Sequence, residues 1–436
     1  MSICRGSTYI YRTTRITTAA QSAVPRAPVA WKISCPPVIA TFTTSSRHRS
    51  DPPKSSIAKE TERHNRELQQ QTASNGDDAN MSKMGYTDKM SEKSKKGPSI
   101  PRPSASVLLI SPQNQVLLLQ RVKQSSSFAS AHVFPGGNIS EFHDGRCPEP
   151  EHPDRHVDSD VYRMAAIRET FEESGIVLAR NNGFGRLIEV PEKEREEGRR
   201  LVHGSEVPFS QWLSKHGGRA DLEGLTPFTR WVTPTNVPKR FTTQMYLYFL
   251  PTLGGTKLAE GDDGKDGEEV DIPSPTTDGG KEHTTARFLP ASAWLRLAQE
   301  GRIILFPPQF FLLHQVAQHL DTLKSPTDYG SISREAVPRE ELEARRKGLL
   351  EFVKQGSPPW TDMCISPTVL PARDGKKRED GRSVLGLSRP GPELEKQRPG
   401  PTGPTDQCVV IGFRKEGPRQ VAVVSREDAL AGGAKL

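Results

Sequence analysis

The sequence is poor in the residues that build large hydrophobic cores. Only 33% of its 436 residues are hydrophobic and 6% are aromatic, whereas it contains 37 prolines and 36 glycines. A chain of this length has room for two or three average domains, but this composition favours one folded domain with long flanking segments. No apolar run approaches the length that crosses a bilayer. We therefore expect no membrane span.

Cysteine and basic charge are also too scattered to define a site. The five cysteines form no CxxC pair, which argues against a zinc site or a disulfide framework. They are Cys4, Cys35, Cys147, Cys364 and Cys408. The net charge of +7 is modest, and basic residues alternate with acidic ones instead of forming a stripe interleaved with aromatics. The charge alone therefore predicts no nucleic-acid partner.

Both ends of the chain carry features of targeting signals. Residues 1–50 are rich in Arg, Ser and Thr, and no acidic residue precedes Asp51, as is typical of a mitochondrial transit peptide. A basic disordered leader or an over-extended start is an equally weighted alternative. The final tripeptide Ala434-Lys435-Leu436 is a close variant of the Ser-Lys-Leu peroxisomal address. We expect recognition by the peroxisomal import receptor, with the mitochondrion as the alternative destination.

Composition divides the chain into three regions. Residues 1–98 are predicted to be a disordered leader and linker, because a polar segment cannot bury enough surface to offset the entropy of ordering. Residues 99–322 form the predicted main domain, interrupted by an acidic, Gly-rich loop over 251–286. Residues 323–436 are predicted to be a partly ordered C-terminal extension.

Hydrophobic periodicity predicts the elements of the two folded regions. Two buried strands in a hairpin are expected over 105–110 and 116–120, and two further strands are expected between Phe228 and Leu250. The remaining predicted elements are helices over 291–300, 307–320 and 340–354, and hairpin arms over 409–413 and 420–424.

A further predicted helix collects negative charge at its C-terminal end. Asp158 or Ser159 is the expected N-cap, and Gly175 is expected to follow the last turn. At 100° per residue the apolar side chains fall on one side and the glutamates within about a 100° arc opposite. The apolar set is Met164, Ile167 and Phe171, and the acidic set is Glu169, Glu172 and Glu173.

These glutamates repel one another, and those in the last turn also face the negative end of the helix dipole, each effect costing about 0.3–1 kcal/mol. A solvated, Glu-rich surface would explain an isolated ExxEE pattern. Here Arg168 directly precedes the pattern and can orient one carboxylate, and the upstream pair Gly136-Gly137 lets backbone approach a phosphate closely. Clustered hard oxygen ligands are what Mg²⁺ or Mn²⁺ requires.

The stretch from Arg168 to Ile176 (RETFEESGI) resembles the second half of the Nudix box, Arg-Glu-U-x-Glu-Glu-x-Gly-U. Its first half departs from the pattern: Gly137 and Arg168 are 31 positions apart, where the box has 14. His143 stands at the position of the box glutamate, and Glu141 and Asp144 are the nearest acids.

An insertion inside the box resembles the peroxisomal coenzyme A diphosphatase branch of the family, as do three further stretches. These are Ser130–Gly137 (SAHVFPGG), Trp231–Pro234 with Pro238–Thr242, and Leu305–Gln309 (LFPPQ). The resemblance implies an α/β Nudix fold, an α/β/α sandwich with a mixed sheet. It also implies metal-dependent cleavage of coenzyme A or acyl-coenzyme A to 3′,5′-ADP and a 4′-phosphopantetheine product. Another nucleotide substrate (NADH, a nucleotide sugar or an RNA cap) and a non-catalytic binding protein are the alternatives.

On this resemblance Glu169, Glu172 and Glu173 hold Mg²⁺ or Mn²⁺, and Arg168 holds a box carboxylate in place. Glu282 is a candidate base or additional ligand from outside the box. The candidate substrate contacts are Gly136, Gly137, Arg121 and Arg240; a solvated Lys239-Arg240 pair and a core role for Trp231 are the plainer interpretations.

Overall fold

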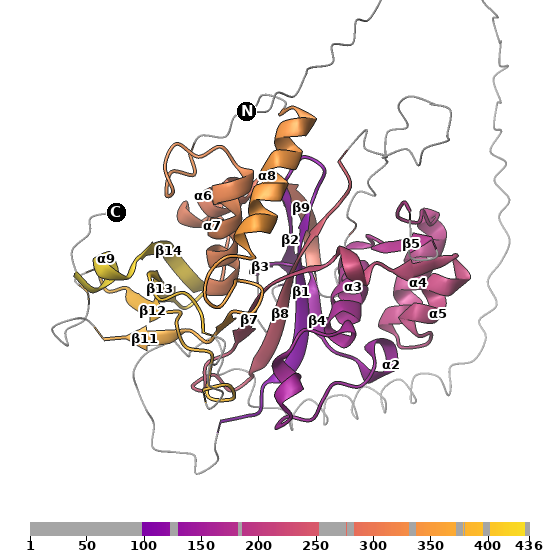
Figure 1. Cartoon of the computed structure of the whole chain (residues 1–436), viewed down its shortest axis with the longest axis horizontal. Coiled ribbons are helices and arrows are strands. Elements are labelled where there is room, and N and C mark those ends of the chain that lie inside the picture. Colours follow the sequence, from indigo (N-terminus) through magenta and orange to yellow (C-terminus); the bar gives the residue numbers. More distant parts are fainter. Residues whose placement is uncertain are drawn as a thin grey trace, which may run out of the picture. The chain divides into compact units, whose positions relative to one another are not determined.

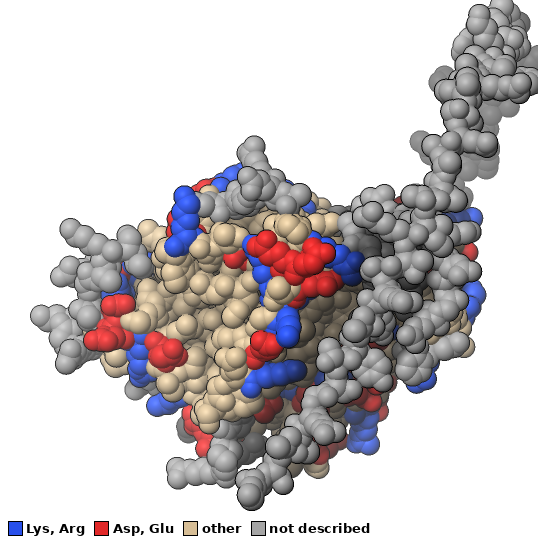
Figure 2. All heavy atoms as spheres, turned by 45° about the horizontal axis from the view of Figure 1, so that its top comes forward, with Lys and Arg blue, Asp and Glu red and all other residues tan. Residues whose placement is uncertain are grey.

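The computed structural model describes residues 98–122, 130–181, 185–252, 276, 283–330, 337–371, 378, 380–395 and 402–431. Residues 1–97 of the predicted leader, Glu282 and the terminal tripeptide lie outside these residues. Within them, no helix combines the length and the apolar character that crossing a membrane requires. On the face shown in Figure 2, basic side chains lie in small groups beside acidic ones.

A mixed eight-stranded sheet forms the centre of the described part of the chain. Along its main path β10, β7, β8, β1, β2 and β3 are neighbours, while β4 pairs with β1 and β9 with β2. β1 runs parallel to β8 and antiparallel to β2, which confirms the predicted mixed sheet and its first hairpin. The strands are β1 (Arg102–Ile110), β2 (Val116–Arg121), β3 (His132–Val133), β4 (Gly136–Asn138), β7 (Thr226–Val232), β8 (Phe241–Phe249), β9 (His283–Leu289) and β10 (Cys364–Ile365).

Alternation along β1 sends its side chains into two separate cores, one on each face of the sheet. Val107 and Leu109 pack with the helix α3, whereas Leu108 and Ile110 pack with α6 and α7. Helices therefore cover both faces, and the predicted α/β/α sandwich is confirmed (Figure 1). The helices are α3 (Asp160–Ser174) on one face, and α6 (Ala291–Gln299), α7 (Pro307–Leu320) and α8 (Arg339–Phe352) on the other.

α3 is the predicted glutamate-rich helix, with the expected ends. Ser159 is its N-cap, and Gly175 adopts the left-handed conformation at φ 73° that favours glycine after a last turn. Ile167 and Phe171 are fully buried, as predicted, but the opposite side is not a solvated face: Ala165, Ala166 and Glu173 are buried there too. The helix lies between the sheet and a second layer of structure.

That layer comes from chain segments for which no element was predicted. It comprises α4 (Glu192–His203) and α5 (Phe209–Lys215), with the small sheet of β5 (Ala179–Asn181) and β6 (Gly218–Ala220) and the short helix η3 (Leu222–Gly224). The insertion within the box also has structure, a short helix α2 (Glu141–Asp144) and a 3₁₀ turn η2 (Pro153–His156). Trp212 of α5 stacks on Phe171 of α3 with ring centroids 4.4 Å apart.

The C-terminal region adds a four-stranded antiparallel sheet and a short helix. Its last two strands form the predicted hairpin, and their inward side chains belong to the same core as α7. These elements are β11 (Thr368–Leu370), β12 (Ser383–Gly386), β13 (Gln407–Arg414), β14 (Gly417–Ser425) and α9 (Arg426–Ala431). The predicted acidic loop over 251–286 extends too far, because His283 already begins strand β9, which pairs with β2.

Candidate active site

Arg168 is the centre of a buried cluster of charges. Its guanidinium donates to both carboxylate oxygens of Asp144, from Nε at 2.9 Å and from Nη2 at 2.8 Å. Its Nη1 donates to Glu169 at 2.9 Å and to Glu172 at 2.8 Å. Only 4% of the arginine side chain is exposed. Burial works against its positive charge, but Glu169, Asp144 and Glu172 outweigh that effect and raise the pKa of Arg168.

Glu141 and Asp144 are the two acids nearest to the open position of the box. Of these two, Asp144 is the one that contacts Arg168. Helix α2 turns Asp144 inward, where its carboxylate also accepts from the backbone N–H of Ser140 at 2.8 Å. Glu141 lies on the exposed side of the same short helix. His143, which stands at the box position, is buried and accepts a hydrogen bond from the backbone N–H of Phe209 at 3.2 Å. The insertion therefore supplies an aspartate to Arg168 from the position directly after His143.

Strand β4 brings the two glycines against the glutamates. The backbone N–H of Gly136 donates to Glu173 at 2.8 Å. A Cβ atom on Gly137 would lie 2.4 Å from the carboxylate carbon of Glu169, closer than real Cβ atoms come to other heavy atoms. Glycine is needed here because the carboxylate occupies the space of a side chain. Both glycines therefore contact the acidic cluster itself.

The three glutamates of α3 meet different partners. Burial raises the pKa of Glu169 to about 7 against the favourable charge of Arg168, and Glu172 adds to the increase. Glu172 lies 3.1 Å from Nδ1 of His203 on α4. Glu173 Oε1 lies 3.6 Å from Nε2 of His283, which is fully buried on β9. The cluster concentrates carboxylates where anions are costly without a nearby cation.

This donor set fits a hard divalent cation in chemistry, since it offers carboxylate oxygens from one turn and a half of helix. The side chains are engaged with Arg168, Gly136 and the two histidines instead of converging. Among the described residues no three acidic, histidine or cysteine side chains form a ready-made metal-binding group. Binding a cation would therefore require the glutamates to exchange some of these contacts for the metal.

Several other predicted site residues lie elsewhere. Arg240 is buried, and its guanidinium donates to Glu393 at 2.6 Å and to the backbone oxygen of Ser99 at 2.8 Å. The interpretations of Arg240 as a substrate contact and as a solvated residue are both corrected: this arginine belongs to an internal ion pair.

Trp231 is a core residue, as its plainer interpretation predicted. Arg121 is the register partner of His283 between β2 and β9.

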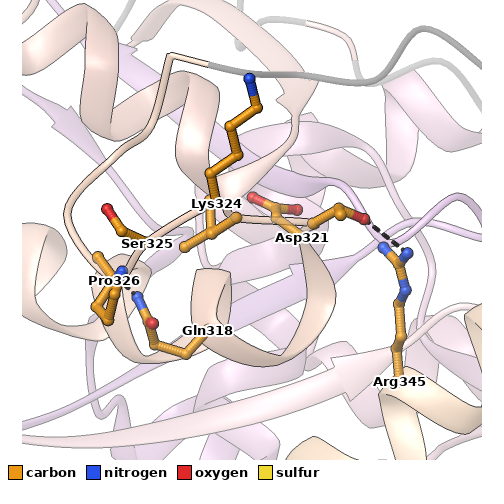
Figure 3. Close-up of a pocket in the computed structure, with 8 residues that line it drawn as sticks. Gln318, Asp321, Lys324, Ser325, Pro326 and Arg345 are labelled. Atoms are coloured by element: carbon orange, nitrogen blue, oxygen red, sulfur yellow. Dashed lines mark hydrogen bonds between the residues drawn. The ribbon is translucent and has the colours of Figure 1, made fainter.

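A surface hollow at another place in the described part of the chain is separate from this cluster. It has a volume of about 440 Å³ and lies where α7 ends, beside α8 (Figure 3). Arg345 donates to Thr322 there at 2.8 Å and also pairs with Glu341. Its lining residues are Gln318, Asp321, Thr322, Leu323, Lys324, Ser325, Pro326 and Arg345. The glutamates of α3 contribute nothing to this hollow.

Comparison with known proteins finds a domain match and distant relatives. Residues 100–253 match the NUDIX domain family profile. The chain is 24% identical over 239 residues to "Putative nudix hydrolase 7" of Caenorhabditis elegans, covering 55% of this chain and 68% of that protein. It is 29% identical over 184 residues to "Acyl-coenzyme A diphosphatase NUDT19" of Gallus gallus, covering 32% and 49%. The chain thus spans between about half and two thirds of the curated relatives it matches.

A NUDIX hydrolase structure from Alicyclobacillus acidocaldarius shares 22% identity at a TM-score of 0.38, covering 55% of this chain and 98% of that one. The residues that match the NUDIX domain include Arg168, the α3 glutamates and the two glycines of β4. In the structure these residues contact one another. The chain thus contains a Nudix domain over residues 100–253, and at low identity it resembles the coenzyme A diphosphatase branch of the Nudix hydrolases.

Proposed function

We propose that this protein is a divalent-metal-dependent pyrophosphohydrolase that cleaves coenzyme A or acyl-coenzyme A to 3′,5′-ADP and 4′-phosphopantetheine or its acyl derivative. The observation that carries the hydrolase proposal is the cluster in which Arg168 joins Asp144 to Glu169 and Glu172, with Glu173 held by Gly136. The substrate proposal rests on the likeness to the Gallus gallus protein described above and to a Xenopus laevis protein of the same name, acyl-coenzyme A diphosphatase NUDT19.

Glu169, Glu172 and Glu173 would hold Mg²⁺ or Mn²⁺. When bound, the cation would supply charge to offset the leaving phosphate and would lower the pKa of the attacking water. The chain's own residues prepare that site. Arg168 holds the carboxylates of Glu169 and Glu172. The backbone N–H of Gly136 holds the carboxylate of Glu173. Gly137 presents no side chain toward Glu169, which leaves that carboxylate room beside β4.

The direct test is mass-spectrometric identification of the products formed from coenzyme A by the purified protein with Mg²⁺ and, in parallel, with EDTA. We expect 3′,5′-ADP and 4′-phosphopantetheine with the metal and neither product with the chelator. A panel containing NADH, a nucleotide sugar and capped RNA tests the substrate. If coenzyme A and its esters were the poorest substrates of that panel, the substrate proposal would be wrong while the hydrolase proposal stood.

A further inference from the structure

Helix α4 attaches to the C-terminal end of α3 through one buried arginine. Arg199 donates from Nε at 3.0 Å and from Nη2 at 2.8 Å to the backbone carbonyl oxygen of Glu172. The last four carbonyls of a helix have no partner within the helix, and this carbonyl is one of them. Arg199 thus satisfies an otherwise unpaired acceptor at the residue whose side chain is a proposed metal ligand.

A second bond at this helix end comes from Thr276. Its backbone N–H donates to the carbonyl oxygen of Ser174 at 3.0 Å, and its Oγ1 accepts from Nη1 of Arg199 at 2.8 Å. Two terminal carbonyls of α3 are therefore capped from outside. The guanidinium also places a positive charge at the negative end of the helix dipole. The three glutamates interact unfavourably with that end of the dipole.

Close packing fixes the position of Arg199. The preceding residue, Gly198, lies so near the Trp212 ring that a Cβ atom there would come within 2.3 Å of it. The same ring stacks on Phe171 of α3 at 4.4 Å. The indole is thus held between the two helices, and α4 cannot slide along α3 without breaking this contact. One turn beyond Arg199, His203 meets the Glu172 carboxylate at 3.1 Å.

We infer that Arg199 is a positioning residue that fixes the backbone at Glu172, and through it the carboxylates of Glu172 and Glu173, for divalent cation binding. The inference rests on the proposed function. In this role Arg199 would act on the backbone of α3 and not on substrate or reacting atoms. Its effect acts through the last turn of α3, whose carbonyls it holds while Arg168 and Gly136 hold the side chains.

Mn²⁺ binding to the full-length protein, measured by electron paramagnetic resonance, tests this inference with a readout that does not need turnover. Arg199→Met is expected to weaken Mn²⁺ binding about tenfold, the lower end of what loss of a metal ligand's supporting partner causes. Arg199→Lys should recover part of the affinity, because an ammonium keeps the charge and one donor. We expect the metal concentration for half-maximal hydrolysis to rise in parallel, with KM for coenzyme A little changed.

Arg200→Met is the matched control. Arg200 neighbours Arg199 on α4, but it is exposed and forms ion pairs with the surface residues Glu197 and Glu206. Equal Mn²⁺ affinity in Arg199→Met and Arg200→Met, with normal binding by the wild type, would overturn the inference alone. A wild type that neither binds Mn²⁺ nor hydrolyses a diphosphate would overturn the proposed function as well. If Arg199→Met does not fold, Arg199→Lys and Thr276→Val carry the same comparison.

Discussion

Asp144 and Arg168 form a two-bonded ion pair that is almost entirely removed from solvent, with side chains 0% and 4% exposed. The pair joins the insertion within the box to the helix that carries the glutamates. Removing one partner of a buried pair leaves the other charge uncompensated, which costs more than the pair itself contributes. The insertion is therefore tied to the acidic cluster by an interaction that the fold cannot easily lose.

Asp144→Asn should lower the free energy of unfolding by about 3 kcal/mol, as expected when a buried ion pair is broken, and should reduce hydrolysis by releasing Arg168. Urea unfolding and steady-state kinetics measure the two effects. Glu141→Gln, on the exposed side of the same helix, is the control and should change neither. Equal behaviour of the two variants would contradict the assignment of Asp144 as the upstream partner.

Gly137→Ala should displace the Glu169 carboxylate, because the new methyl group would overlap it. A displacement on the order of 1 Å in a catalytic group can cost about a hundredfold in rate, so we expect a loss of that order in kcat/KM. Gly348→Ala on α8 is the matched change, since a Cβ there meets nothing within 4 Å and alanine favours a helix. A fully active Gly137→Ala enzyme would show that Glu169 is not required where it lies.

Glu173→Gln should abolish hydrolysis while leaving the melting temperature unchanged or raised. The amide keeps an oxygen that accepts from Gly136, and the repulsion within α3 falls. We expect the loss to exceed the roughly 10–100-fold that changes to the partners of metal ligands cause. Glu192→Gln, exposed on α4, serves as the control in the same assays. Undiminished turnover by Glu173→Gln would remove Glu173 from the metal site.

Acid should destabilise the fold through His314. Burial lowers the pKa of this histidine to about 4 from an ordinary 6.5, and its Nδ1 lies 2.7 Å from the Tyr329 hydroxyl. Between these values the unfolded chain binds a proton that the folded chain does not, so stability is complete above pH 6.5 and falls as the pH drops toward 4. The loss is about 3 kcal/mol over that window.

Urea unfolding of the wild type and His314→Gln at pH 8 and at pH 4.5 measures this dependence. The difference at pH 8 reports the cost of the substitution itself. The variant should lose less stability than the wild type between the two pH values. Identical losses would mean that His314 takes up its proton equally in the folded and unfolded chains.

The tripeptide Ala434-Lys435-Leu436 remains a prediction from sequence, since it lies outside the described residues. We expect a fluorescent protein carrying this ending to enter peroxisomes, and the full chain lacking the three residues to leave them. Mitochondrial fluorescence of both forms would instead favour the basic segment over residues 1–50. Co-localisation with markers of the two organelles distinguishes these outcomes.

The strands and helices with strong periodicity could be predicted from sequence, because burial on one or both faces marks β1, β2 and α7 directly. Helix α4 could not. Its sequence EKEREEGRRLVH is almost wholly polar, and of its residues only Gly198, Arg199 and Val202 are buried. A helix that packs through a glycine and an arginine leaves no apolar stripe to detect.

The candidate site likewise has a part that the sequence predicts and a part that it does not. The glutamates and Arg168 are close in sequence, so helical spacing alone placed them together. The contacts of Arg199 and His283 with the site depend on how distant segments pack. Arg240 was misinterpreted for the same reason, since Glu393 lies 153 positions further along the chain.

The C-terminal sheet has a consequence for how the protein can be divided. Val409, Ile411, Val421 and Val423 pack in the same core as α7, and β10 extends the main sheet beside β7. A fragment that stops at residue 253, where the NUDIX match ends, lacks the C-terminal strands and α7. The apolar face of the main sheet that they cover would then be exposed to water. The segment that sequence comparison recognises is thus shorter than the unit that folds. A fragment bounded by it should be recovered as aggregate, whereas a chain reaching residue 431 keeps its own cover.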